Sequence, residues 1–299
     1  MLDMHSLNNE TTEGNQQITR MVHIVDADGR LAVVNAISGD MLKHIQAEHF
    51  QSLAQARGLP LCAGCRVFDA NRINSEADFV EKLPVDDNAA GLDAVIRHCA
   101  LDDAEGILVT ANNRSLPRKS TVEFGWLVGL PESTRTESYF HVKYDPRKRG
   151  ESSGDPEGAN VGQAIFYRPA SSGIYAAVCT IEVARVGWND LTRKYVVDED
   201  QRRLRARTVV ESVMYSFVRP LGAHRNTQNP HILGFRGVVT VSTAAVPAPT
   251  VSPLSHGYVE QVKGITEQLN RTWPGAVDVY EFGSLAEFSK VMTDLLQAV

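Results

Sequence analysis

The chain has 299 residues, of which 43% are hydrophobic and 22% are charged, and its formal net charge at pH 7 is −6. A chain of this length and composition forms one elaborated globular domain or two smaller ones. The acidic balance excludes nonspecific attraction to nucleic acid through bulk charge, so nucleic-acid binding would require a local basic groove.

The first ten residues, MLDMHSLNNE, lack the basic start and apolar centre of a signal peptide. The longest uncharged stretch, residues 237–259, contains three prolines and many Ser and Thr residues, so it does not predict a membrane span. Four cysteines in this length do not make a disulfide framework, which fits a reducing compartment. We therefore expect a cytoplasmic protein without a membrane partner.

The first predicted elements are a β-hairpin and a helix. Residues 21–37 form two apolar stretches around Asp26-Ala27-Asp28-Gly29, a turn sequence that predicts the hairpin. The segment VNAISGDMLKHIQAEH, residues 34–49, then leads through Ser38-Gly39 into a helix with one apolar face. The unpaired N–H groups and the dipole at a helix start favour an anion there.

Residues 58–130 are short, irregular pieces around a helix predicted at 89–99, and we expect a partly helical insertion with its own small core. A strand is predicted at 138–144. The next eighteen residues, 145–162, are rich in Gly, Ser, Pro and charge, and a loop of that length is typically functional or disordered. Strand patterns resume at 163–168 and 172–186.

The last third alternates helices and strands. We expect helices at 197–217, at 259–271 and from residue 285, and strands at 237–243 and 277–282. The loop after the first of these helices contains GAHRNTQNP, residues 222–230. This alternation, combined with hairpins and long insertions, favours an α+β fold in which one antiparallel sheet carries helices on one face.

Four sequence blocks, taken in order, resemble the DevR autoregulator family, whose members are backbone subunits of type I CRISPR surveillance (Cascade) complexes. The blocks are HSLNNE (5–10), NAISGDMLKHIQAEH (35–49), GQAIFYRPASSGIYA (162–176) and GAHRNTQNP (222–230). Only six residues precede Leu7, whereas in the family a first strand runs well ahead of the matching Leu-Asn pair. The completeness of that strand is therefore open.

The resemblance implies an α+β, RRM-like (ferredoxin-like) palm with a helical finger insertion and a thumb β-hairpin. On this chain the parts are palm at 1–57, 131–141 and 174–299, fingers at 58–130, and thumb at 142–173. The implied function is antiviral defence as a non-catalytic subunit that oligomerises along the guide RNA (crRNA). The implied partners are guide RNA, the target DNA strand, further copies of itself and other Cascade subunits, with no cofactor.

By this resemblance, the helix entrance grips guide phosphates. Backbone N–H groups at Gly39 and the Ser38 hydroxyl would hold phosphate oxygens, Lys43 would supply charge, and His44 would donate a hydrogen bond. The alternative reading from the residues alone is that Ser38 or Asp40 is an ordinary N-cap and Lys43 lies on a solvated face.

Two further segments carry candidate RNA ligands. Arg20 closes the polar loop of residues 8–20, where it could clamp a phosphate or be an ordinary surface arginine. The turn in GAHRNTQNP offers a group of hydrogen-bond donors suited to sugar and phosphate, unless it is only a polar turn before a strand. Its candidates are His224, Arg225, Asn226 and Gln228.

In the predicted thumb, Gln163, Phe166 and Arg168 place an aromatic ring beside a cation. Stacking a base on an aromatic side chain contributes roughly 1 to 3 kcal/mol and tolerates any base. The alternative is that Phe166 belongs to the core of the hairpin.

Two other functions compete with this one, and a candidate metal site is a separate question. Relatives that cut target RNA use an aspartate on the loop that matches residues 8–20, and this loop contains Glu10 and Glu13 but no aspartate. A DNA-binding autoregulator is a second alternative, although no helix-turn-helix pattern is present. Cys62 and Cys65 could be half of a zinc site completed by Cys99 or His98, but a single CxxC is a weak signal, and no metal site is predicted.

Overall fold

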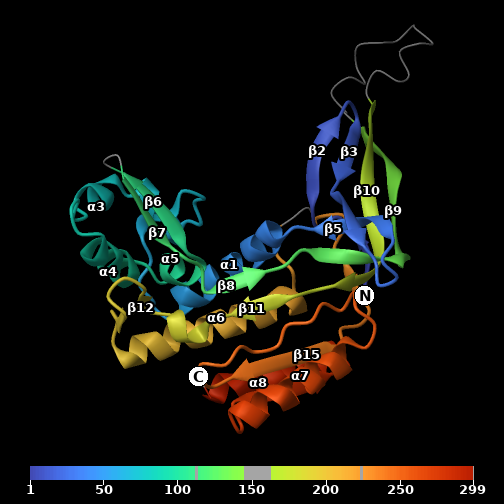
Figure 1. Ribbon diagram of the computed structural model, residues 1–299. Coiled ribbons are helices and arrows are strands. Elements are labelled where there is room, and N and C mark those ends of the chain that lie inside the picture. Colours follow the sequence, from blue (N-terminus) through green and yellow to red (C-terminus); the bar gives the residue numbers. More distant parts are fainter. Residues whose placement is uncertain (112–113, 145–162, 223–224, 299) are drawn as a thin grey trace, which may run out of the picture. The chain divides into compact units, whose positions relative to one another are not determined.

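The computed structural model describes residues 1–111, 114–144, 163–222 and 225–298. These residues divide into two compact units (Figure 1). The strand unit comprises Met1–Ile37, Leu127–Ala176 and Ala223–Leu233, and the helical unit comprises Ser38–Trp126, Ala177–Gly222 and Gly234–Val299. The α+β class is confirmed, while the division into palm, fingers and thumb stays a prediction.

The strand unit is built on a mixed sheet with the strand order β14-β1-β10-β9-β5-β4 and with a hairpin, β2-β3, attached through β3 to β10. Its strands are β1 (Leu2–His5), β2 (Asn9–Glu13), β3 (Gln16–Thr19), β4 (Met21–Val25), β5 (Leu31–Ile37), β9 (Leu127–Tyr144), β10 (Gln163–Ala176) and β14 (His231–Ile232). The predicted hairpin at 21–37 is confirmed as β4-β5. The first strand is present as β1, which pairs with β10 and β14.

Residues 8–20 were expected to form a loop, and this is wrong. They fold as the β2-β3 hairpin, in which Glu13 pairs with Gln16 and Asn9 with Thr19. The strands carry Thr, Glu and Gln on both faces, so they show no apolar alternation that would predict a strand from sequence. Pairing with β10 at Tyr167 supplies the support that local sequence lacks.

A buried polar layer lies in the strand unit around His5. The His5 ring packs edge-on against Tyr175 with centroids 5.0 Å apart, and the Tyr175 hydroxyl donates to Oδ1 of Asn35 at 2.8 Å. Burial lowers the pKa of His5 to about 4. The imidazole is therefore neutral in the folded protein at neutral pH.

We expect His5 to make the fold acid-sensitive. Unfolded chains protonate histidine below about pH 6.5, whereas folded His5 resists protonation until about pH 4, so stability falls as pH falls through this window. At pH 5 this difference in protonation lowers the free energy of unfolding by about 2 kcal/mol relative to its value at pH 7.5. Urea unfolding of wild type and His5→Gln at pH 7.5 and pH 5 measures it: the variant should lose less stability on acidification. Equal losses in both proteins would contradict the assignment.

The helical unit contains all of the described α-helices. They are α1 (Gly39–Ala56), α2 (Ala63–Arg66), α3 (Ala77–Glu81), α4 (Asn88–His98), α5 (Ala100–Glu105), α6 (Glu199–Val218), α7 (Tyr258–Thr272) and α8 (Leu285–Ala298), with 3₁₀ turns η1 (Arg72–Ser75) and η4 (Val183–Arg185). Its short strands pair as β6-β7 (Ile107–Ala111, Arg114–Arg118), β8-β11 (Val122–Phe124, Cys179–Ile181), β12-β13 (Trp188–Asn189, Lys194–Tyr195) and β15-β16 (Gly237–Ser242, Val277–Phe282). None of the described helices is long and apolar enough to cross a membrane.

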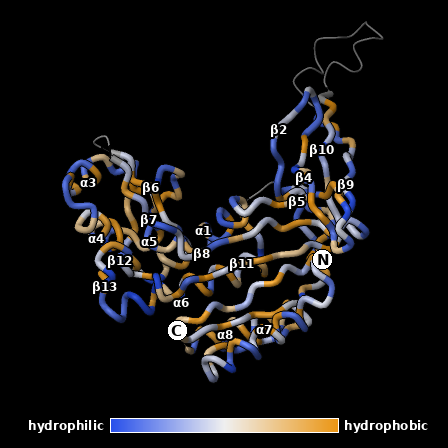
Figure 2. The backbone as a smooth tube through the Cα atoms, viewed as in Figure 1, coloured by the Kyte–Doolittle hydropathy of each residue, from blue (hydrophilic) through white to orange (hydrophobic). Residues whose placement is uncertain are grey.

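The insertion at 58–130 was expected to have its own small core, and this is wrong. Its buried residues, such as Leu92, Ile96 and Leu101, belong to one hydrophobic cluster that also includes Phe50 of α1 and Val209 of α6. Figure 2 shows hydrophobic positions recurring along the helices of this unit. Because the insertion cannot bury its apolar faces alone, it folds against the long helices.

The C-terminal elements match the sequence prediction closely. The strand predicted at 277–282 is β16, and the helices predicted at 197–217 and 259–271 are α6 and α7. The strand predicted at 172–186 is confirmed only in part: β10 ends at Ala176, a second short strand, β11, follows, and the chain then turns through η4.

Candidate nucleic-acid interface

The two long strands β9 and β10 of the strand unit form an antiparallel ribbon. In its register Phe166 lies opposite His141, and Arg168 lies opposite Tyr139. Side chains alternate between the two faces of a strand pair, so these four residues share one face, together with Lys143. This cation-and-aromatic face is therefore set by the pairing of segments about 25 residues apart.

The side chains on this face contact one another. Phe166 and His141 stack with their ring centroids 5.6 Å apart and their planes 11° apart. The guanidinium carbon of Arg168 lies 4.8 Å above the Phe166 ring, a cation–π contact. Phe166 is half-buried and Lys143 is exposed. Phe166, His141 and Arg168 therefore form one cluster of rings and a cation on this face of the ribbon.

The loop at 225–228 lies beside this face within the strand unit. Arg168 donates to the Thr227 hydroxyl at 3.0 Å, and Gln228 donates from Nε2 to the Pro169 carbonyl at 2.8 Å. The loop turns through a hydrogen bond from Gln228 N–H to the Arg225 carbonyl at 3.1 Å. Asn226 is exposed at its tip. The two chain segments therefore form one continuous polar surface.

The side chain of Arg225, in the same loop, has a buried hydrogen-bond donor without an acceptor in the part of the chain that the structure describes. Its Nε atom is buried and has no hydrogen-bond partner among the described residues. A buried N–H without an acceptor costs free energy, and an incoming oxygen atom would remove that cost. Arg168 thus supplies a guanidinium beside the Phe166 ring, and Arg225 adds a second guanidinium in the adjacent loop. Guanidinium groups next to an aromatic ring are the combination that holds a phosphate while a base stacks.

The entrance of α1, in the helical unit, uses its predicted ligands for its own structure. The Ser38 hydroxyl accepts from Met41 N–H at 3.2 Å as an N-cap. Gly39 is buried, and a Cβ atom there would lie 2.6 Å from the carbonyl oxygen of Phe124. Glycine at this position therefore allows α1 and β8 to approach closely.

Lys43 lies one turn into α1 and points into the helical unit. Its ammonium donates to the Glu105 carbonyl at 3.0 Å and to the Ser120 hydroxyl at 2.7 Å, and it lies 3.7 Å from the buried Glu105 carboxylate. Burial lowers the pKa of Lys43, and the Glu105 charge opposes that shift. The exposed His44 ring packs instead on Phe68, with centroids 5.3 Å apart.

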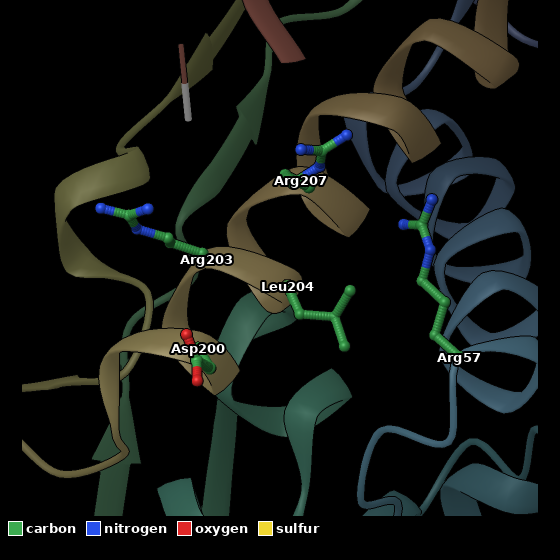
Figure 3. A pocket seen from close by; sticks show the side chains of 5 residues that line it. All are labelled: Arg57, Asp200, Arg203, Leu204 and Arg207. Carbon is green, nitrogen blue, oxygen red and sulfur yellow. The ribbon is translucent and has the colours of Figure 1, made fainter. Parts of the chain in front are cut away.

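A shallow hollow of about 350 Å³ in the helical unit also gathers cations (Figure 3). It is lined by Arg57, Asp200, Arg203, Leu204 and Arg207. Arg57 pairs with Glu211, Arg203 pairs with Glu199, and Asp200 adds a negative charge at the rim. Internal acids thus already neutralise most of its positive charge, which makes it a poorer anion site than the ribbon.

Residues 1–263 match the sequence profile described as the CRISPR-associated negative auto-regulator DevR/Csa2. The chain belongs to the DevR/Csa2 family. No curated protein sequence matches it. Among solved structures, a chain of a "CRISPR RNA-guided surveillance complex, pre-nicking" is 11% identical with a TM-score of 0.51, over 99% of this chain and 96% of that chain. Csc2 of Thermofilum pendens is 12% identical with a TM-score of 0.30, over 100% and 88%.

In this DevR/Csa2 family member, the predicted ligands fall into two groups. The strand unit contains Phe166, Arg168, Arg225, Asn226 and Gln228, and the helical unit contains Ser38, Gly39, Lys43 and His44. Arg20, in the strand unit, pairs with Glu10. Gln163 lies in β10 opposite Tyr144, and His224 lies outside the described residues.

The sequence reasoning missed His141, Tyr139 and Lys143, which share the ribbon face with Phe166. The signal was available in the alternation of YFHVKY, residues 139–144, but its pairing with β10 could not be assigned, because nothing local fixes the register across an eighteen-residue gap.

We expect Gly39→Ala to lower the stability of the helical unit by about 1 to 3 kcal/mol, because the added methyl would overlap the Phe124 carbonyl. Thermal unfolding measures this. The matched control is Gly264→Ala in α7, where a Cβ meets no atom within 4 Å and alanine should be neutral or stabilising. A Gly39→Ala protein as stable as wild type would contradict the packing role.

Proposed function

We propose that this protein is a non-catalytic backbone subunit of a type I CRISPR surveillance (Cascade) complex that binds the guide RNA. The observation that carries the proposal is membership of the DevR/Csa2 family over residues 1–263. The fold shared with a chain of an RNA-guided surveillance complex, over 99% of this chain, supports it.

The proposed contact surface is the ribbon face around Phe166 together with the loop at 225–228. A guide that pairs with many targets must be held through phosphates, sugars and shape, because its base edges must stay available for pairing. Stacked aromatic rings and guanidinium donors provide this kind of grip. Repetition of the subunit along the guide, and support of its pairing with a target DNA strand, belong to the same proposal.

The proposal assigns no catalytic step to the β2-β3 hairpin. Glu10 there pairs with Arg20, an arrangement suited to holding β2 near the start of β4. The entrance of α1 remains a proposed RNA contact, through Ser38, Gly39, Lys43 and His44. It ranks below the ribbon, because the side chains of Ser38 and Lys43 already bind groups of the protein itself.

Co-expression with a guide RNA and the partner subunits encoded beside it tests the function. We expect one particle containing the guide and several copies of this chain, with no metal-dependent cleavage of added target RNA. A complex of this chain with the partner subunits that purifies without any guide RNA would contradict the proposal. Sequence-specific binding of the free chain to operator DNA would favour an autoregulator instead, and cleavage of target RNA would favour a nuclease.

A further inference from the structure

The helical unit contains four buried side chains that the candidate interface does not use: Cys62, Cys65, Cys99 and Asp102. One ligand atom from each, three Sγ atoms and one carboxylate oxygen, lies within 4.8 Å of all the others. The exposed fraction is 1% for Cys62 and Cys65 and 0% for Cys99 and Asp102. We propose that these four side chains bind one structural zinc ion.

The distances suit a single tetrahedral ion. Zinc binds thiolate sulfur at about 2.3 Å and carboxylate oxygen at about 2.1 Å, so the edges of its coordination tetrahedron are about 3.6 to 3.8 Å long. Cys62 Sγ and Cys65 Sγ lie 3.4 and 3.7 Å from Oδ2 of Asp102. Three thiolates select zinc over magnesium or calcium, which prefer all-oxygen sites.

The local backbone is arranged around the sulfur atoms. Cys62 caps α2 and its Sγ accepts from Cys65 N–H at 3.4 Å, while Cys99 caps α5 and its Sγ accepts from Asp102 N–H at 3.4 Å. N–H donation to sulfur stabilises the thiolate form that a metal requires. Both cysteine-bearing turns therefore present their sulfur atoms in the form expected of ligands.

Gly64, between the first two cysteines, is also required by this arrangement. A Cβ atom there would lie 2.2 Å from the Arg72 carbonyl oxygen, so only glycine lets η1 pack against the Cys62–Cys65 turn. This packing also places the Arg72 guanidinium 3.8 Å from Oδ1 of Asp102. Arg72 is thus placed to offset the negative charge of a zinc ion bound by three thiolates and a carboxylate.

A purely apolar role does not explain Asp102. Its Oδ1 atom is buried and accepts no hydrogen bond from the described residues, and a carboxyl group is costly in a hydrophobic cluster. A divalent cation bound by Oδ2 of Asp102 and by the thiolates would give this buried carboxylate a ligand in addition to its ion pair with Arg72.

The sequence left open whether Cys99 or His98 completes a zinc site with Cys62 and Cys65, and the structure distinguishes the two. His98 is engaged elsewhere, with Nε2 3.1 Å from the Glu76 carboxylate and its ring stacked on Phe79 at 4.0 Å. Cys99 joins the pair instead, and Asp102 is a fourth ligand that the CxxC pattern did not suggest. The inference does not depend on RNA binding, so either can fail alone.

Metal analysis of the purified chain by plasma mass spectrometry tests the site. We expect about one zinc per chain in wild type, and a decrease of tenfold or more in zinc affinity for Cys65→Ser and for Cys99→Ser. Cys179→Ser is the matched control, because Cys179 is the one other cysteine and lies outside the cluster, so zinc should be unchanged. Wild type that neither contains zinc nor takes it up when zinc is added would overturn the proposal, as would full zinc content in both serine variants.

Two measurements keep the test decisive if the serine variants misfold. Wild type loaded with Co²⁺ should show intense thiolate charge-transfer and tetrahedral ligand-field absorption, and a weak octahedral spectrum would overturn the site. Asp102→Cys should keep zinc while Asp102→Ala weakens its binding, because cysteine can replace a metal ligand in such a site. Equal zinc affinity in Asp102→Ala and wild type would remove Asp102 from the ligand set.

Discussion

Asp103→Ala should destabilise the helical unit by about 3 to 5 kcal/mol, the largest stability effect that we expect from one substitution. The Asp103 carboxylate accepts from Arg118 at 2.8 Å and from Arg205 at 3.0 Å, and all three side chains are fully buried. It also accepts from Gly187 N–H at 2.9 Å. Removing it leaves the buried Arg205 guanidinium without a carboxylate partner among the described residues and leaves Arg118 with Asp190 alone, at 3.0 Å.

The matched control for this prediction is Glu199→Ala. Glu199 likewise binds two arginines, Arg202 and Arg203, but it does so in solvent, where ion pairs contribute little. Urea unfolding followed by circular dichroism compares the two variants. If Asp103→Ala unfolds at the same urea concentration as Glu199→Ala, the buried cluster does not stabilise the unit in the way that its geometry implies.

The second large effect concerns RNA. Phe166→Ala combined with Arg168→Ala should weaken guide RNA binding by tenfold or more, since a stacked base contributes about 1 to 3 kcal/mol and the arginine adds a bond to phosphate. The slope of log affinity against log salt should also become shallower by about 0.7 for each phosphate group that the variant no longer neutralises. Fluorescence anisotropy with labelled guide RNA over a salt series measures both quantities.

Phe140→Ala provides the control on the same ribbon. Phe140 is 57% exposed and pairs with Tyr167 on the opposite face, so its removal deletes an equally large ring without touching the proposed interface. RNA affinity should stay at the wild-type value. Weaker binding by Phe140→Ala, together with unchanged binding by the Phe166 and Arg168 double variant, would place the RNA on the other face of the ribbon.

The sequence predicted those elements that depend on local pattern. The hairpin at 21–37 carries a turn sequence between apolar stretches, and the helix at 197–217 carries acidic residues at its start. The β2-β3 hairpin was missed because its polar strands derive their order from β10. Local signals of this kind are absent when a segment is stabilised mainly by tertiary pairing.

The candidate site was predictable only in part, for a similar reason. Lys43 looks like an exposed cation in the first turns of a helix, but its partner Glu105 lies 62 residues further along the chain. Arg168 and Thr227 are 59 residues apart. Residue types indicated that these segments bind a polar partner, whereas the cation-and-aromatic face required the register of β9 against β10.

Ultraviolet cross-linking of the chain to its guide RNA, followed by mass spectrometry of the linked peptides, tests the central claim most directly. If the protein holds a guide RNA on the ribbon and the adjacent loop, cross-links should concentrate on the peptides that contain 139–143, 166–168 and 225–228. At equal protein and RNA concentrations, the Phe166 and Arg168 double variant should form far fewer of them. Cross-links confined to other peptides, or equal in number in the double variant, would contradict the account.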